Sequence, residues 1–450
     1  MVYESTSGEI TLTFTGDAMI SRGLMSFREE RFLRMRDLFY AADVRFTNAE
    51  ILFHNYEDWP TYISQTYMRC DPRFIKDLQW LGINIVSCAN NHGTDFGENG
   101  VLTNIRNLDE AGLVHAGTGE NYAEAVEPAY IDTPKGRVAL ISATSSARAN
   151  SRAGEQRRDM KGRPGVNLIR WINEWTVDEA AFESLKRVAG AFGWQQRMAS
   201  WWTGAYGAGT GDAVYFTDRN SLGVGSEDPA SRFVLGDGFE RHSRVHQGDV
   251  ERNLQSIREA RRMADWVVFT VHSHEGGKQV DEPSEHIVEL AHAAIEAGAD
   301  VFVGHGPHLD RGIEVYQGKP VLYGLGNFII QNDTVLRLPH ESMVTRGLGH
   351  ENTPADFYSA RRTEMAHDYK GTDPHWQSAI AQVSFSRQGL REIRLHPIEF
   401  GYGLSRGQAG RPILAEGKEA EEVISRFQRL SAGFGTKVEA DGETGTVRVG

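Results

Sequence analysis

Six side chains of the types that bind divalent metal ions each follow an apolar run in the sequence. They are two carboxylates, one amide and three imidazoles: Asp17, Glu50, Asn91, His272, His305 and His308. Mixed nitrogen and oxygen ligands without thiolates suit Mn²⁺, Fe²⁺ or Zn²⁺ and argue against a structural zinc site. A central carboxylate can bridge two ions about 3.5–4 Å apart, an arrangement that activates water. The residues therefore predict a catalytic site that holds one or two divalent metal ions.

An alternation of strands and helices explains how residues so far apart in the sequence would meet. Alternating or continuous apolar runs predict strands over 9–15, 44–47, 83–88, 138–142, 266–271, 301–303 and 320–324. In open α/β sheets, ligands bind beyond the carboxyl ends of the strands. Five of these strands would deliver the candidate ligands to one edge. The pattern predicts an α/β fold with a mixed or parallel sheet covered by helices on both faces.

The helices between these strands carry start and stop signals. They are expected over 72–81, 100–111, 249–264 and 285–297. Asp71 and Ser284 are of the types that cap a helix at its first turn. Gly82 and Gly298 are placed to end the same two helices.

Two stretches interrupt the rhythm and are interpreted as insertions. Residues 146–247 would form a basic loop and a tryptophan-rich lid over the pocket, and residues 331–377 a second, polar insertion. Residues 1–145 and 248–330 would form the core, and residues 378–450 a closing strand pair with a C-terminal tail. The first insertion holds five tryptophans that would either form its own core or line the pocket: Trp171, Trp175, Trp194, Trp201 and Trp202.

Taken together and in order, the motifs resemble those of the CapA family of poly-γ-glutamate capsule proteins, a branch similar to the calcineurin-like metallophosphoesterases. The matching segments are Gly16-Asp17, Asn48-Ala49-Glu50, Ala89-Asn90-Asn91-His92 with Asp95 and Gly97, His272, Gly304-His305-Gly306-Pro307-His308 and Leu325-Gly326-Asn327-Phe328. The resemblance covers about 9–145 and 249–330. It implies a four-layer α/β/β/α metallophosphoesterase-like sandwich around two metal ions.

The resemblance also implies how the ligands divide between the ions. The first ion would take Asp17 and His308, the second Asn91, His272 and His305, with Glu50 bridging both. The first motif of the wider superfamily adds a histidine two residues after its aspartate, where this chain has Met19. The first site would therefore lack one ligand.

His92 and Asp95 are the predicted catalytic pair. The resemblance makes His92 the general acid or the group that stabilises a developing oxyanion, with Asp95 as its orienting partner. His274 lies two residues after His272, on the same face of an extended chain, and would bind substrate or metal. Asn327 is interpreted as a turn residue near the site.

A basic segment follows the strand predicted over 138–142 and leaves the sheet at the same edge as the metal ligands. Arg148, Arg152 and Arg163 in it are candidates for binding a carboxylate or phosphate of the substrate. The alternative is a solvated surface loop.

Charge and composition limit the partners. The net charge of -13 argues against nucleic acid and against an anionic membrane surface. Two cysteines provide no disulfide framework. The first residues show no export signal, and no run is long and apolar enough to span a membrane, so a cytoplasmic location is expected. An export signal removed from the chain and self-association both stay open.

These observations favour a metal-dependent hydrolase that uses a metal-bound hydroxide. The capsule-family resemblance and Met19 favour an amide or ester of a carboxylate-bearing small molecule, or a γ-glutamyl compound, as a small or short polymeric anionic substrate. A phosphoesterase is the enzymatic alternative. A non-catalytic capsule-assembly or binding protein is the alternative of another class.

Overall fold

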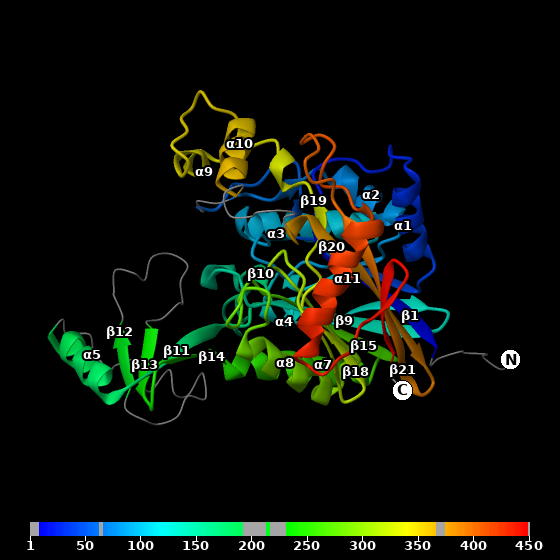
Figure 1. Ribbon diagram of the computed structural model, residues 1–450. Coiled ribbons are helices and arrows are strands. Elements are labelled where there is room, and N and C mark those ends of the chain that lie inside the picture. The colour runs from blue at the N-terminus through cyan, green and yellow to red at the C-terminus, as the bar shows by residue number, and fades with distance from the viewer. Residues whose placement is uncertain (1–8, 63–65, 192–212, 217–230, 366–373, 449–450) are drawn as a thin grey trace.

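The computed structural model describes residues 9–62, 66–191, 213–216, 231–365 and 374–448. These residues form two main β-sheets packed face to face, with helices on both outer faces (Figure 1). The predicted α/β class and the four-layer α/β/β/α arrangement are confirmed.

The first sheet has a parallel half and an antiparallel half. The parallel half carries Asp17, and Glu50 and Asn91 lie in the loops that follow two of its strands. Its parallel strands are β1 (Ile10–Met19), β2 (Val44–Asn48), β5 (Ile85–Ser87), β6 (Val114–Ala116) and β19 (Asn327–Ile330). Its antiparallel strands are β20 (Gln377–Ser386), β21 (Gly389–Glu399), β22 (Ile413–Leu414), β23 (Glu439–Asp441) and β24 (Thr444–Arg448). The antiparallel pair β20–β21 is the closing strand pair expected from the sequence.

The second sheet places two histidines side by side. Its order is β17 (Ile313–Tyr316), β18 (Lys319–Leu322), β16 (Val301–His305), β15 (Trp266–His272), β9 (Gly136–Thr144) and β8 (Ala129–Thr133). The four central strands are parallel, and β8 and β17 are antiparallel edge strands. In the register of β15 with β16, His272 is the partner of His305. The strand ends therefore lie at the same level.

Apolar side chains from both sheets fill the space between them. Leu12 and Phe14 of β1 and Val268 of β15 belong to this central core, and α11 (Gly417–Ala432) adds Phe427. One outer face is covered by α1 (Glu30–Tyr40), α2 (Ile75–Leu81) and α3 (Gly97–Ala111), and the other by α7 (Gln247–Arg261) and α8 (Glu285–Ala297). A fully buried Phe or Leu contributes about 1.5–3 kcal/mol, so the sandwich holds the strand ends rigidly.

The helix signals in the sequence predicted α2, α3, α7 and α8 to within a few residues, whereas no prediction covered α1. The Asp71 carboxylate accepts a hydrogen bond from the Arg73 amide, and Gly82 ends α2 with φ 104°. Gly298 ends α8 with φ 118°. The Ser284 hydroxyl makes no bond to the amides of α8, although the residue occupies the predicted cap position.

The first strand is longer than the sequence predicted. It was expected to end at residue 15, but β1 continues to Met19 because β19 pairs with its last residues. The pairing with β2 is irregular between Phe14 and Asp17. Asp17 consequently lies within the strand. The sequence pattern of 9–15 holds no sign of β19, which follows some 300 residues later.

The first insertion contains a sheet of its own, which projects from the core at the left of Figure 1. It consists of β11 (Trp171–Val177), β12 (Ala213–Phe216), β13 (Ser231–Leu235), β14 (Glu240–Val245) and the helix α5 (Glu179–Ala191). The Trp171 ring stacks on His286 of α8 with centroids 4.9 Å apart, and Trp175 stacks on Phe233. Neither tryptophan lines the cavity next to His92 and Asp95. The other three tryptophans of the prediction lie outside the described residues: Trp194, Trp201 and Trp202.

Short elements complete the described chain. They are β3 (Leu52–Phe53), β4 (Arg69–Cys70), β7 (Thr118–Gly119), α4 (Tyr122–Ala125), β10 (Gly165–Val166), α9 (His340–Val344) and α10 (Pro354–Met365), with one-turn 3₁₀ helices at Pro72–Phe74, Ala149–Ser151, Asn332–Thr334 and Pro374–Trp376. Cys70 and Cys88 are buried free thiols. Across the described ranges, no helix is both long and apolar enough to cross a membrane.

Gly16 permits the close approach that brings Asp17 into the site, and its replacement tests this. A Cβ at Gly16 would lie 1.7 Å from the Leu325 carbonyl oxygen and 2.0 Å from that of Gly326. Gly16→Ala is expected to lower the free energy of unfolding by about 3 kcal/mol or more, measured by urea denaturation. The control is Gly190→Ala within α5, where space is open and a gain of up to about 1 kcal/mol is expected. An unchanged urea midpoint for Gly16→Ala would contradict the prediction.

Candidate metal centre

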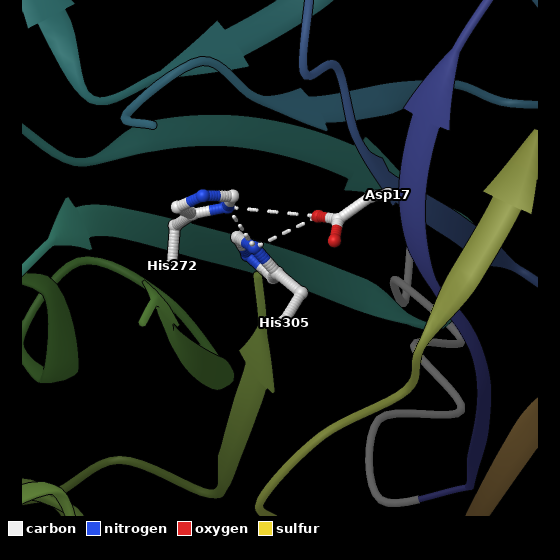
Figure 2. Close-up of side chains that lie close together, drawn as sticks. All are labelled: Asp17, His272 and His305. Carbon is white, nitrogen blue, oxygen red and sulfur yellow. Dashed lines mark hydrogen bonds and ion pairs between the residues drawn. The ribbon is translucent and has the colours of Figure 1, made fainter. Parts of the chain in front are cut away.

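Asp17, His272 and His305 meet where strand ends of the two sheets face each other (Figure 2). Asp17 Oδ1 lies 3.6 Å from His272 Nδ1 and 3.5 Å from His305 Nδ1. The two Nδ1 atoms are 3.2 Å apart. All three side chains are buried, and their ligand atoms lie within 4.8 Å of one another. This cluster can hold one metal ion.

Neighbouring polar groups fix the orientation of these ligands. The Asn48 amide donates to Asp17 Oδ1 at 2.8 Å. His305 Nε2 lies 2.7 Å from the Thr270 hydroxyl, which leaves Nδ1 facing Asp17. Partners of this kind hold an imidazole in one tautomer for a metal. Neither Asn48 nor Thr270 was predicted from the sequence to have a role. The only indication in the sequence was that both residues lie at or near the end of a strand, close to residues already predicted to be metal ligands.

A second cluster adjoins the first and consists of Glu50, His274 and His308, whose ligand atoms also lie within 4.8 Å of one another. His308 Nδ1 is 3.8 Å from Glu50 Oε2 and 3.3 Å from Asp17 Oδ2. Asp17 thus contacts the first cluster through Oδ1 and the second cluster through Oδ2. This grouping differs from the one that the resemblance implied, which assigned Asp17 with His308 to one ion and His272 with His305 to the other.

His308 is held in an uncommon conformation. Its φ is +59°, in the left-handed region, and its Nδ1 lies 2.9 Å from Asn327 Oδ1. Asn327 also donates to the carbonyls of His308 and His375. Asn327 was predicted to be a turn residue, but it begins β19, and its side chain anchors a ligand.

Three buried oxygens of the predicted metal ligands have no hydrogen-bond partner among the described residues. They are both carboxylate oxygens of Glu50 and Oδ1 of Asn91. A buried acceptor left without a partner costs about 1–3 kcal/mol. Bound cations would remove this cost, and carboxylate, amide and imidazole donors suit Mn²⁺, Fe²⁺ or Zn²⁺. The residues present therefore fit a divalent metal centre.

The protonation states agree with this interpretation. Burial raises the pKa of Glu50 well above its usual value, and the charges of Asp17 and Asp95 raise it further. Burial also acts to raise the pKa of Asp17, but hydrogen bonds with His272, His305 and His308 outweigh it and hold that pKa well below the ordinary range. Burial lowers the pKa of His272 to about 4, so at neutral pH its imidazole is neutral and able to bind a metal.

His92 and Asp95 form a hydrogen-bonded pair beside the clusters. His92 Nδ1 lies 2.6 Å from Asp95 Oδ2, and that oxygen also accepts from the Met68 amide. Asp95 is buried, and His92 is largely so. His92 Nε2 is 3.7 Å from Glu50 Oε1. An imidazole oriented by a buried carboxylate, next to metal ligands, can hold or donate a proton at Nε2.

A cavity of about 380 Å³ opens next to this pair. It is lined by Asn91, His92, Asp95, Ser146, Ala147, Arg148, His274 and Glu275. The volume suits a small molecule or the end of a polymer. Glu275 and Ser146 were not predicted from the sequence.

Of the three arginines predicted to bind substrate, only Arg148 lines the cavity. It is partly buried, which lowers its pKa although the charge of Asp95 acts to raise it. Arg152 lies elsewhere, because the buried Asp249 binds its guanidinium at 3.3 Å and Tyr122 stacks on it. Arg163 donates to the Arg152 carbonyl. The structure therefore does not bring Arg152 and Arg163 to the site.

The second insertion adds a positive charge that the sequence analysis missed. Arg361 of α10 donates to the Thr66 hydroxyl, and its charge acts on Glu50. Burial lowers the pKa of Arg361. A guanidinium near a buried carboxylate lessens the cost of ionising it.

This chain is similar to known proteins over most of its length. The family model described as "Bacterial capsule synthesis protein PGA_cap" matches residues 11–332. The chain is 31% identical over 452 residues to an uncharacterized protein of Sinorhizobium fredii, covering 98% of this chain and 93% of the relative. It is 36% identical over 145 residues to the PGA biosynthesis protein CapA of Bacillus subtilis, covering 30% of this chain and 37% of that one. It is 22% identical to the capsule biosynthesis protein CapA of Bacillus anthracis, covering 71% and 60%. The chain belongs to the PGA_cap family, within the metallophosphoesterase-like superfamily.

Proposed function

We propose that the protein is a metal-dependent hydrolase that cleaves an amide or ester of a carboxylate-bearing compound, with γ-glutamyl compounds as the preferred class. The observation that carries the proposal is the His92–Asp95 pair, which borders both the metal-ligand clusters and the cavity. A purely structural metal site would need neither an oriented proton donor nor an adjoining cavity.

The residues divide the chemistry between them. Divalent ions bound by the two clusters would polarise the substrate carbonyl and lower the pKa of a water. His92 would donate a proton from Nε2 to the leaving nitrogen or oxygen, since Asp95 holds Nδ1. Asn91, on the cavity wall, would add its side-chain oxygen to the ligands.

The preference for an anionic substrate rests on Arg148. Its guanidinium is the cation that the sequence analysis assigned to substrate and that lines the cavity. A planar guanidinium pairs well with a carboxylate. The relatives named for PGA and capsule biosynthesis favour glutamyl chemistry.

A paired metal and activity measurement tests the proposal. The full chain, reconstituted with Mn²⁺ or Zn²⁺, is analysed for metal content and assayed on γ-glutamyl amides, carboxylate esters and phosphate esters. Metal-dependent turnover of the first two classes is the expected result. Turnover of phosphate esters alone would identify a phosphoesterase. Bound metal without turnover of any class would favour a capsule-assembly or binding role.

Arg148→Gln is expected to raise KM for a carboxylate-bearing substrate about 10–100-fold, with a smaller change in kcat, because a charged hydrogen bond contributes about 1.5–3 kcal/mol. Arg163→Gln is the matched control, since it removes the same charge from the same segment away from the cavity. Its KM is expected to stay at the wild-type value. Equal KM changes in both variants would show that only the general charge of the segment matters.

A further inference from the structure

His274 stands at the cavity, exposed to solvent, in contact with the metal-ligand clusters. Its Nε2 is 3.1 Å from His272 Nε2, and its ring is perpendicular to that of His308 with centroids 5.5 Å apart. Glu50, His274 and His308 each offer a ligand atom within 4.8 Å of the others. We infer that His274 is a direct ligand of the metal ion held by Glu50 and His308. This inference rests on the metal centre of the proposed function.

The ion held by Glu50 and His308 receives no ligand from the end of β1. Two residues after Asp17, Met19 is buried in the apolar core beneath the outer helices and offers the ion nothing. Asp17 is shared with the first cluster through its other oxygen. Metal ions in catalytic sites keep three or more protein ligands with an open position. His274 comes from the opposite sheet, just beyond β15, and completes such a set.

The loop that carries His274 is fixed by a partly buried hydrogen-bond network centred on Glu275. The His274 amide donates to the Ser146 hydroxyl at 2.6 Å, and that hydroxyl donates to Glu275 at 2.6 Å. The hydroxyls of Ser145 and Ser273 donate to the other oxygen of Glu275. A solvated surface histidine needs no such support, whereas a metal ligand must be held in place.

The opposite side of the loop is held by a buried arginine. Arg311 is 1% exposed, and its guanidinium donates to the Glu275 carbonyl at 2.8 Å. Weaker contacts at 3.4 Å reach the carbonyls of Ser273, His274 and Val280. The backbone on both sides of His274 is thus fixed from two directions. This support favours a ligand over a side chain that adapts to different substrates.

Metal binding to the full chain tests the inference without any substrate. The metal-free protein is titrated with Mn²⁺ by calorimetry, and the number of bound ions is checked by elemental analysis. We expect two ions for the wild type. We expect His274→Ala to bind one ion with unchanged affinity and the other about 100-fold more weakly or not at all. His274→Gln keeps a side-chain oxygen and is expected to bind the second ion with intermediate affinity.

Two controls keep the result interpretable. His292→Ala removes a histidine of α8 that stacks on Tyr316 and belongs to neither ligand cluster, and this variant should bind two ions. The melting temperature of metal-free His274→Ala should equal that of the wild type, because the side chain is exposed. Two ions bound to His274→Ala with wild-type affinity would overturn the inference, as would a wild type that binds fewer than two. A wild type that binds two ions but hydrolyses nothing would overturn the proposed function alone.

Discussion

Replacing His92 with alanine is expected to lower kcat about 10²–10⁴-fold, the usual contribution of a positioned acid, while leaving the metal content unchanged. His92 lies beside Glu50 but belongs to neither ligand cluster. Its Nδ1 is engaged by Asp95, so the substitution removes a proton donor and leaves the metal ligands in place. Kinetics and elemental analysis on the same preparation measure both effects.

The dependence on the leaving group provides the control for this variant. An amide leaves poorly without a proton, whereas a nitrophenolate leaves readily. The loss in His92→Ala should therefore be large for amides and small for nitrophenyl esters. Asp95→Asn should reproduce the pattern, since it disturbs the tautomer of the same imidazole. A loss of equal size for both leaving groups would mean that His92 orders the site without transferring a proton.

The ligands were predictable from the sequence because parallel strands impose a common edge. His272 and His305 end adjacent strands in register, so their meeting follows once β15 and β16 are recognised. Asp17 was predicted by the same argument, although its strand runs on to Met19. That extension depends on pairing with β19, and no local pattern in 9–15 encodes a partner so distant in the sequence.

Groups supplied by loops and insertions could not be predicted in this way. Glu275 acts through hydroxyls of three serines, and such networks leave no periodic trace in a sequence. The charge of Arg361 acts on Glu50 only because α10 packs near the site. Arg148 and Arg152 are close in sequence and identical in type, yet the buried Asp249 binds Arg152 and leaves Arg148 to line the cavity.

Two carboxylate substitutions should have opposite effects on the metal-free protein. Glu50 has a raised pKa because it is buried and faces Asp17 and Asp95. Its stability contribution therefore falls as pH rises from the unfolded-state pKa through the higher folded-state pKa. Glu50→Gln removes this loss and should raise the metal-free melting temperature at pH 8. Asp17 contributes stability above its unfolded-state pKa, because His272, His305 and His308 outweigh burial and lower its folded-state pKa. Asp17→Asn should lower the melting temperature at the same pH.

With metal, the two variants should behave alike. Mn²⁺ at 100 times its Kd should stabilise the wild type by about 2.7 kcal/mol, or about 3 °C in a chain of this size. Both variants lack a carboxylate of the ligand clusters and should lose most of this gain. Scanning calorimetry with and without Mn²⁺ measures both effects in one series. If the metal-free Glu50→Gln protein melts at as low a temperature as Asp17→Asn, Glu50 already has a stabilising partner in the metal-free protein. The lack of hydrogen-bond partners on its two carboxylate oxygens would then not indicate a bound cation. Opposite shifts without metal, combined with a shared loss of the metal-induced gain, would support the assignment of both carboxylates to the metal centre.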